Sequence, residues 1–132
     1  MGYNTGMRYK EISWFPVIIV IIVLIAVSYP YIYAARAGGG EYVFGGFLLN
    51  PLDGNSYLAK MYQGWSGSWR YRLAFSADPG EGAHLFLFYL FLGHLARVLG
   101  LPLLLVFHVG RLFGAAIMLS AMWRFFVALF PK

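Results

Sequence analysis

The chain has 132 residues and is strongly apolar: 61% of the residues are hydrophobic, 20% are aromatic and only 11% are charged. A soluble domain is about half apolar and about a quarter charged, and a small domain buries the smallest share of its surface. The composition therefore excludes an ordinary soluble fold and favours an integral membrane protein in contact with the lipid bilayer. The net charge of +5 comes from scattered basic residues, which excludes nucleic acid as a partner, and the absence of cysteine excludes thiolate chemistry.

The first expected element is a transmembrane helix over residues 14–35. No charged residue occurs between Ile12 and Ala35, and about 20 apolar residues are enough to cross the hydrocarbon core. Aromatic residues at both ends of this stretch are typical of the membrane–water interface. Ala35-Arg36-Ala37 has the small-x-small form of a signal-peptide cleavage site. Because the apolar run is longer than such a peptide needs, we expect a retained anchor.

The charges around this helix set its expected orientation. Arg8 and Lys10 precede the helix, whereas Arg36 and Glu41 follow it. Under the positive-inside rule, this distribution predicts a cytoplasmic N-terminus over residues 1–13. Segment 36–82 is then extracytoplasmic, and we expect a membrane of the bacterial cytoplasmic type.

The extracytoplasmic loop is expected to carry a short amphipathic helix at the membrane surface, at about 54–65. The turn-forming run Asn50-Pro51-Leu52-Asp53-Gly54-Asn55-Ser56 precedes it, and Asp53 could cap its start. Apolar residues then recur at helical spacing, namely Tyr57, Leu58, Met61, Tyr62 and Trp65. Between Trp69 and Phe75 apolar residues alternate with arginines, which is a strand-like period.

The last apolar block runs from residue 83 to residue 130 and is too long for a single membrane helix. Gly100-Leu101-Pro102 is the natural break, because glycine ends helices and proline starts them. We therefore expect a second transmembrane helix over 83–99 and a third over 102–130. The sequence as a whole predicts an all-α membrane protein with about three transmembrane helices.

Three of the polar residues inside these expected spans are candidates for a functional role. Arg111 is the most costly, and a charge at that depth either pairs with another group or extends its side chain to the interface. Gly110 and Gly114 would let another helix approach it closely. His94 and His108 are candidate axial ligands for haem or a chlorophyll-type pigment. The alternative is that both histidines are structural and hydrogen-bonded to a neighbouring helix.

The candidate reactive groups lie in the loop. Asp53 would be a helix cap, or else a general base or metal ligand held just above the bilayer. Glu81 beside His84, at the start of the second expected span, raises the same two possibilities. Three basic residues suit phosphate, pyrophosphate or lipid head groups: Lys60, Arg70 and Arg72.

This order of features resembles the N-terminal part of GT-C-fold membrane glycosyltransferases, which use a sugar on a polyprenyl phosphate. The resemblance rests on Asn50-Pro51-Leu52-Asp53-Gly54-Asn55-Ser56-Tyr57-Leu58-Ala59-Lys60-Met61 and on Gly80-Glu81-Gly82-Ala83-His84, which runs on to Tyr89 and Gly93-His94-Leu95-Ala96-Arg97. In that family an acidic residue of the first loop serves as base or metal ligand. The resemblance therefore implies a catalytic Asp53, secondary roles for Glu81 and His84, and a divalent metal ion as a candidate cofactor.

Members of that family have many more transmembrane helices, and three helices cannot enclose a lipid-linked sugar together with its acceptor. We therefore expect this chain to be an incomplete module that is inactive alone and that works with further transmembrane helices or subunits. The alternative hypothesis is a small accessory subunit of a larger membrane complex, with haem or pigment bound at His94 or His108.

Overall fold

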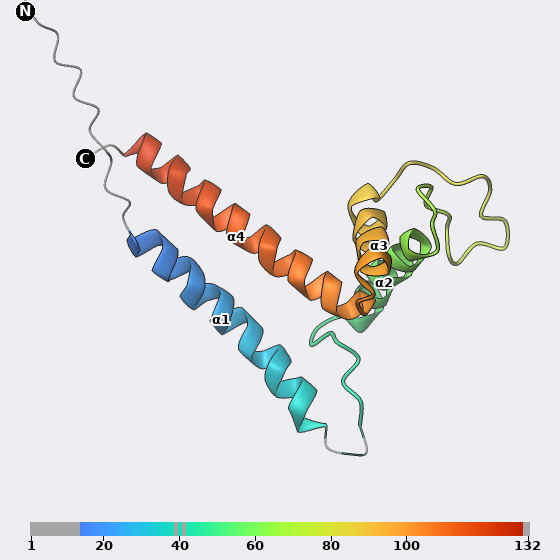
Figure 1. Cartoon of the computed structure of the whole chain (residues 1–132), viewed down its shortest axis with the longest axis horizontal. Helices are drawn as coiled ribbons and strands as arrows, with labels where there is room; N and C mark the ends of the chain where they lie inside the picture. The colour runs from blue at the N-terminus through green and yellow to red at the C-terminus, as the bar shows by residue number, and fades with distance from the viewer. Residues whose placement is uncertain (1–13, 39, 41, 131–132) are drawn as a thin grey trace, which may run out of the picture.

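The computed structural model describes residues 14–38, 40 and 42–130, and this part of the chain is all-helical (Figure 1). The helices are α1 (Trp14–Ala37), α2 (Pro51–Trp65), α3 (Leu87–Leu99) and α4 (Leu103–Leu129). The all-α prediction is confirmed for these residues. The segment expected to be cytoplasmic, 1–13, lies outside them.

Helices α1 and α4 are both long and apolar enough to cross a membrane. With 24 and 27 residues, they measure about 36 and 40 Å, which exceeds the hydrocarbon thickness of about 30 Å. Almost none of their side chains is buried. In a soluble fold such helices would be buried in a core, so their exposed apolar surfaces call for contact with lipid or with other apolar helices.

The two long helices lie side by side and run in opposite directions (Figure 1). At one end the rings of Phe15 and Trp123 are 6.1 Å apart. Toward the other end, the rings of Tyr31 and His108 are 5.1 Å apart. Contacts are thus made near both ends of the pair, which fixes the antiparallel arrangement.

Helix α3 is too short to cross a bilayer as a straight helix. Its 13 residues span about 20 Å, against the roughly 30 Å that is needed. The residues before it are not helical: Ala83 pairs with Tyr71 in a single β-bridge, and Phe86 has φ 54°. Two described helices therefore have spanning length, and a third span over 83–99 stays a prediction.

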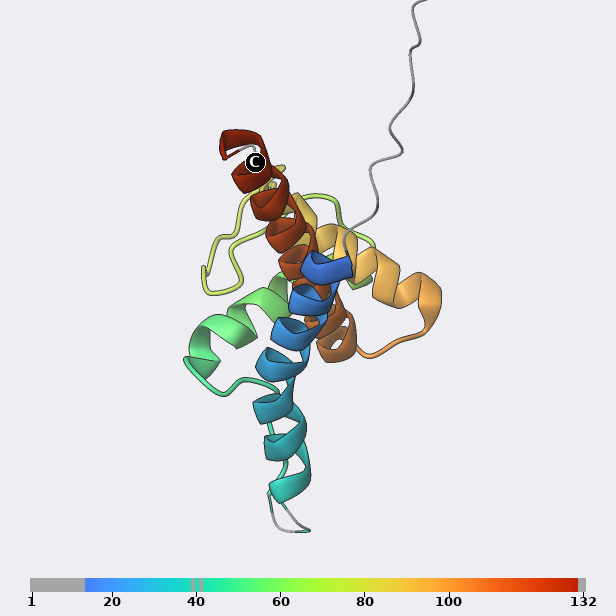
Figure 2. The ribbon, with the colours of Figure 1, turned by 90° about the vertical axis from the view of Figure 1, so that its left-hand side faces the viewer.

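Helices α2 and α3 pack directly against each other and extend sideways from the α1–α4 pair (Figure 2). Two glycines allow the close approach. A Cβ atom on Gly93 would lie 1.9 Å from the carbonyl oxygen of Met61, and one on Gly64 would lie 2.1 Å from that of Leu90. The small core of the protein forms at this crossing and against the start of α4, from Met61, Leu90, Leu92, Ala96 and Val106.

Besides the later start of α3, two further features differ from the sequence expectations. Helix α2 begins at Pro51 rather than near residue 54, because proline is well suited to the first helical position. The alternating segment between Trp69 and Phe75 contributes only the bridge at Tyr71 and otherwise forms turns and bends. With no second partner strand among the described residues, the period-2 pattern alone does not make a sheet.

Candidate functional site

Asp53 lies in the first turn of α2 with an exposed carboxylate. Asn50, and not Asp53, is the residue that precedes the helix, with φ 47° and ψ 66°. The side-chain amide of Asn50 donates a hydrogen bond to the Asp53 carboxylate. A carboxylate in the first helical turn is favoured by the partial positive charge of the helix N-terminus. The structure thus holds Asp53 in an ordered but open position.

An aromatic side chain, that of Phe47, packs against the backbone next to Asp53. The ring of Phe47 occupies the space where Gly54 lacks a side chain, since a Cβ atom there would lie 2.3 Å from the ring. The same ring packs edge-on against Phe107 of α4, with 5.5 Å between centroids. Phe47 therefore packs between the start of α2 and α4.

Lys60, expected to suit phosphate or lipid head groups, is buried with 8% of its surface exposed. Its ammonium donates a hydrogen bond of 2.9 Å to Ser56 Oγ. The rings of Phe86, Tyr57 and Tyr89 lie around it, with centroids 4.4, 4.9 and 5.8 Å from Nζ. Burial, and secondarily the neighbouring Tyr57, raises the pKa of the Tyr89 phenol, so this ring faces the ammonium in its neutral form. Cation–π contacts of this kind hold α2, the segment before α3 and α3 together.

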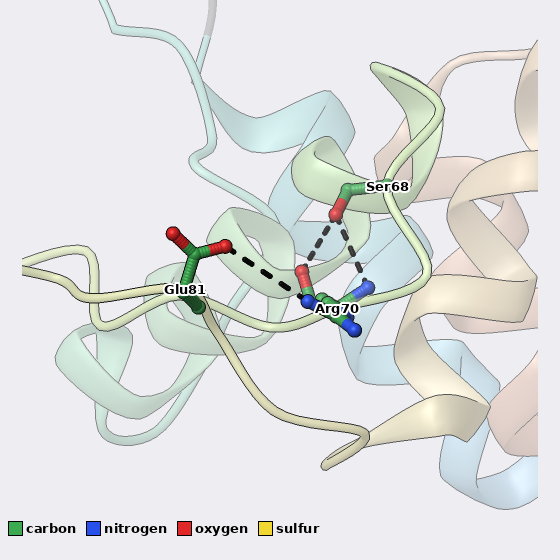
Figure 3. Close-up of polar contacts among 3 residues, drawn as sticks. All are labelled: Ser68, Arg70 and Glu81. Carbon is green, nitrogen blue, oxygen red and sulfur yellow. Dashed lines mark hydrogen bonds and ion pairs between the residues drawn. The ribbon is translucent and has the colours of Figure 1, made fainter.

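The loop between α2 and α3 keeps its arginines near the surface. Arg70 and Glu81 approach to 4.0 Å across the loop, and both side chains are exposed (Figure 3). The backbone of Arg70 is held by Ser68, whose hydroxyl accepts from the Arg70 N–H at 3.1 Å and donates to its carbonyl at 2.6 Å. The side chain of Gln63 binds both backbone groups of Arg72, at 2.8 and 2.9 Å. These contacts leave both guanidinium groups accessible to an anion.

Arg111 lies over the ring of Tyr31, with 4.0 Å from Cζ to the ring centroid. This contact joins the two long helices. Among the described residues, no carboxylate pairs with Arg111, and the sole ion pair is that of Arg70 with Glu81. Within the described part of the chain, an aromatic face is the group that stabilises this charge.

Both histidines of the apolar segments use Nε2 to bind a backbone carbonyl. His94 Nε2 lies 3.2 Å from the carbonyl oxygen of Ser68, and its ring stacks on Trp69 at 4.1 Å. His108 Nε2 lies 3.0 Å from the carbonyl oxygen of Gly46. A carbonyl only accepts, so in each ring Nε2 carries the proton and cannot ligate a metal in this state. The described residues also contain no group of three or more side chains suited to a metal ion.

The predicted site residues are thus divided between two places. Asp53 belongs to the start of α2, whereas Glu81 and His84 belong to the exposed loop before α3, and no hydrogen bond or ion pair among the described residues joins them. The sequence did not indicate that Tyr31 contacts Arg111, since aromatic residues at the ends of the first apolar stretch were expected only to lie at the membrane interface. Nor did it indicate the contacts of Phe47 and Gly46, for which no local pattern gives a signal.

An apolar groove of about 450 Å³ runs between α3 and α4. Its walls include Leu92, Val106 and Gly110, and farther along α4 it reaches Gly114. A Cβ atom on Gly114 would meet nothing within 4 Å. This side of α4 is therefore open to another apolar group.

Comparisons of the chain with protein-family models, with curated proteins and with solved structures gave no match.

Proposed function

We propose that this chain is the N-terminal module of a GT-C-like membrane glycosyltransferase, incomplete and inactive alone, in which Asp53 acts as the general base or as a metal ligand during sugar transfer from a polyprenyl-phosphate-linked donor. The observation that carries the proposal is the exposed carboxylate in the first turn of α2, held by Asn50. The resemblance of the Asn50–Met61 stretch to the first loop of that family also supports the proposal.

In the proposed topology, α1 and α4 span the membrane and the N-terminus is cytoplasmic. The end of α1 and the start of α4 then both lie at the extracytoplasmic face, where α2 and α3 branch off beside α4 (Figure 1). Asp53 would sit at the level at which the sugar of a lipid-linked donor leaves the bilayer. The exposed arginines Arg70 and Arg72 follow the opposite end of α2 from Asp53, where they suit a phosphate or a lipid head group.

The buried state of Lys60 changes one part of the proposal. Because its ammonium is enclosed by three rings and bound to Ser56, Lys60 supports α2 and does not reach a phosphate in this conformation. Of the three residues expected to bind phosphate, only the two exposed arginines remain available for that role.

The experiment uses the intact protein with any further helices that its gene encodes, reconstituted with a polyprenyl-phosphate sugar. Asp53→Asn should abolish transfer while insertion stays unchanged, since the amide oxygen can still accept the bond from Asn50. Asp78→Asn, in the exposed loop, is the matched control and should transfer at the parent rate. Full activity of Asp53→Asn would exclude the assigned role.

The second candidate function is that of a small accessory subunit in a membrane complex. The open apolar groove beside Gly114 favours it, because small residues allow close packing of a further helix. The carbonyl contacts of both histidine Nε2 atoms count against the version with bound haem or pigment. Purification in mild detergent discriminates the two candidates: a coloured complex would support the pigment-bearing subunit.

A further inference from the structure

We propose that His108 is a positioning residue: through Gly46 and Phe47 it fixes the start of α2, and with it Asp53, against α4. The inference rests on the proposed function only for the claim that Asp53 is catalytic. The structural claim, that one histidine of α4 orders the entry to α2, stands on the contacts alone.

The first contact is the hydrogen bond between His108 Nε2 and the carbonyl oxygen of Gly46, at 3.0 Å. Because the acceptor is a carbonyl, Nε2 must carry the proton, and the other ring nitrogen, Nδ1, is left without one in the neutral ring. Nδ1 is buried and has no hydrogen-bond partner in the described part of the chain. The imidazole is therefore held in a single tautomer whose one donor points at the loop.

The second contact is made between Gly46 and Leu104, which lies on the same face of α4 as His108. Leu104 lies one helical turn before His108, and its side chain would be 2.3 Å from a Cβ atom on Gly46. Gly46 is buried and has φ +90°, a conformation that suits glycine. The backbone at Gly46 is thus fixed by a donor from one turn of α4 and by a close apolar contact from the preceding turn.

The third contact is made by Phe47, which connects Gly46 to the helical turn that contains Asp53. Phe47 follows Gly46 directly, and its ring lies 6.1 Å from the His108 ring and 5.5 Å from that of Phe107. The Phe47 ring also covers Gly54, the neighbour of Asp53. If the bond to Gly46 is lost, Phe47 is free to leave Gly54, and the first turn of α2 loses its support.

The test exploits two features of the chain. It contains no cysteine, so paired cysteines can carry spin labels without removal of native thiols. Glutamine can replace the Nε2–H donor of histidine, whereas asparagine is too short to reach the same acceptor and leaves Gly46 unbound. His108→Gln and His108→Asn therefore separate the hydrogen bond from the mere presence of a polar side chain.

We would place labels at Asn55 on α2 and Val109 on α4, both exposed, and measure their distance distribution by pulsed EPR in lipid nanodiscs. The parent and His108→Gln should give one narrow distribution, and His108→Asn a distribution at least twice as broad. A second pair, at Ile18 and Met118, reports on α1 and α4 and should stay unchanged in every variant. A narrow Asn55–Val109 distribution in His108→Asn, or broadening in both variants alike, would overturn the proposal.

Transfer by the intact protein tests the link to Asp53. His108→Gln should keep kcat within about threefold, and His108→Asn should lower kcat at least tenfold with KM unchanged, because the base is displaced while the donor site is intact. Broadening in His108→Asn together with no transfer by the parent protein would retain the positioning role and reject the proposed function. Broadening with an unchanged kcat would reject the effect on Asp53.

Discussion

The guanidinium carbon of Arg111 lies 4.0 Å from the centre of the Tyr31 ring, so a charged side chain of α4 packs on an aromatic side chain of α1. Arg111 is the residue of this helix whose burial in lipid would cost most. Within the described chain, it is the face of Tyr31 that offsets this cost. The pairing of the two long helices and the tolerance of the arginine therefore depend on the same contact.

Replacing the ring of Tyr31 should weaken the α1–α4 pair. Tyr31→Leu removes the π-face and should lower the free energy of unfolding by about 1–2 kcal/mol, the range of a desolvated cation–π contact together with lost packing. Tyr31→Phe keeps the face and is the control. Unfolding in mixed detergent micelles, followed by tryptophan fluorescence, measures both. Equal stability of the leucine and phenylalanine variants would show that the contact contributes nothing.

The close crossing of α2 and α3 predicts that Gly93 tolerates no side chain. A Cβ atom there would lie 1.9 Å from the carbonyl oxygen of Met61 and 2.7 Å from the backbone nitrogen of Trp65, so the helices must separate. Gly93→Ala should cost about 1–3 kcal/mol, as for overpacking in general, or more since backbone atoms must move. Gly114→Ala is the control, because its Cβ would meet nothing within 4 Å. The same unfolding measurement should find that control at parent stability.

Lys60 is expected to be structural, which a pair of substitutions can test. Lys60→Met keeps the length of the side chain among the three rings and removes the cost of a buried charge, so stability should stay within about 1 kcal/mol of the parent. Lys60→Glu should be clearly destabilising, because it places a negative charge against the negative faces of the rings. Binding of vesicles that contain an anionic phospholipid should be unaffected by Lys60→Met. Weaker binding in that variant would return Lys60 to the phosphate-binding role.

The two hydrogen bonds from Gln63 to Arg72 predict a protease-sensitive variant. Gln63→Ala frees the backbone of Arg72, and the loop should then open more often. Trypsin should cleave after Arg70 and Arg72 several-fold faster than in the parent, as read from fragment masses. Ser76→Ala removes only bonds within the loop, to Asp78, and should leave the rate at both arginines unchanged. Parent-like cleavage of the Gln63 variant would mean that other contacts hold the loop.

The sequence by itself determined the long apolar helices and the break between α3 and α4. The charge-free run after Ile12 predicted α1, and α3 ends and α4 begins on either side of Gly100-Leu101-Pro102. These features follow from local chemistry: transfer of apolar side chains out of water, and the limited backbone angles of glycine and proline. They need no information about distant parts of the chain.

Only the tertiary structure decided what the individual polar residues do. The ammonium group of Lys60 could bind a phosphate, yet rings from α2, from the segment before α3 and from α3 enclose it. His108 finds its acceptor at Gly46, 62 positions earlier in the chain. The close packing of residues 87–99 on α2 likewise depends on Gly64 and Gly93 meeting backbone on the opposite helix. Such contacts join residues far apart in sequence, and no periodicity or local preference specifies which of several possible partners will lie beside them.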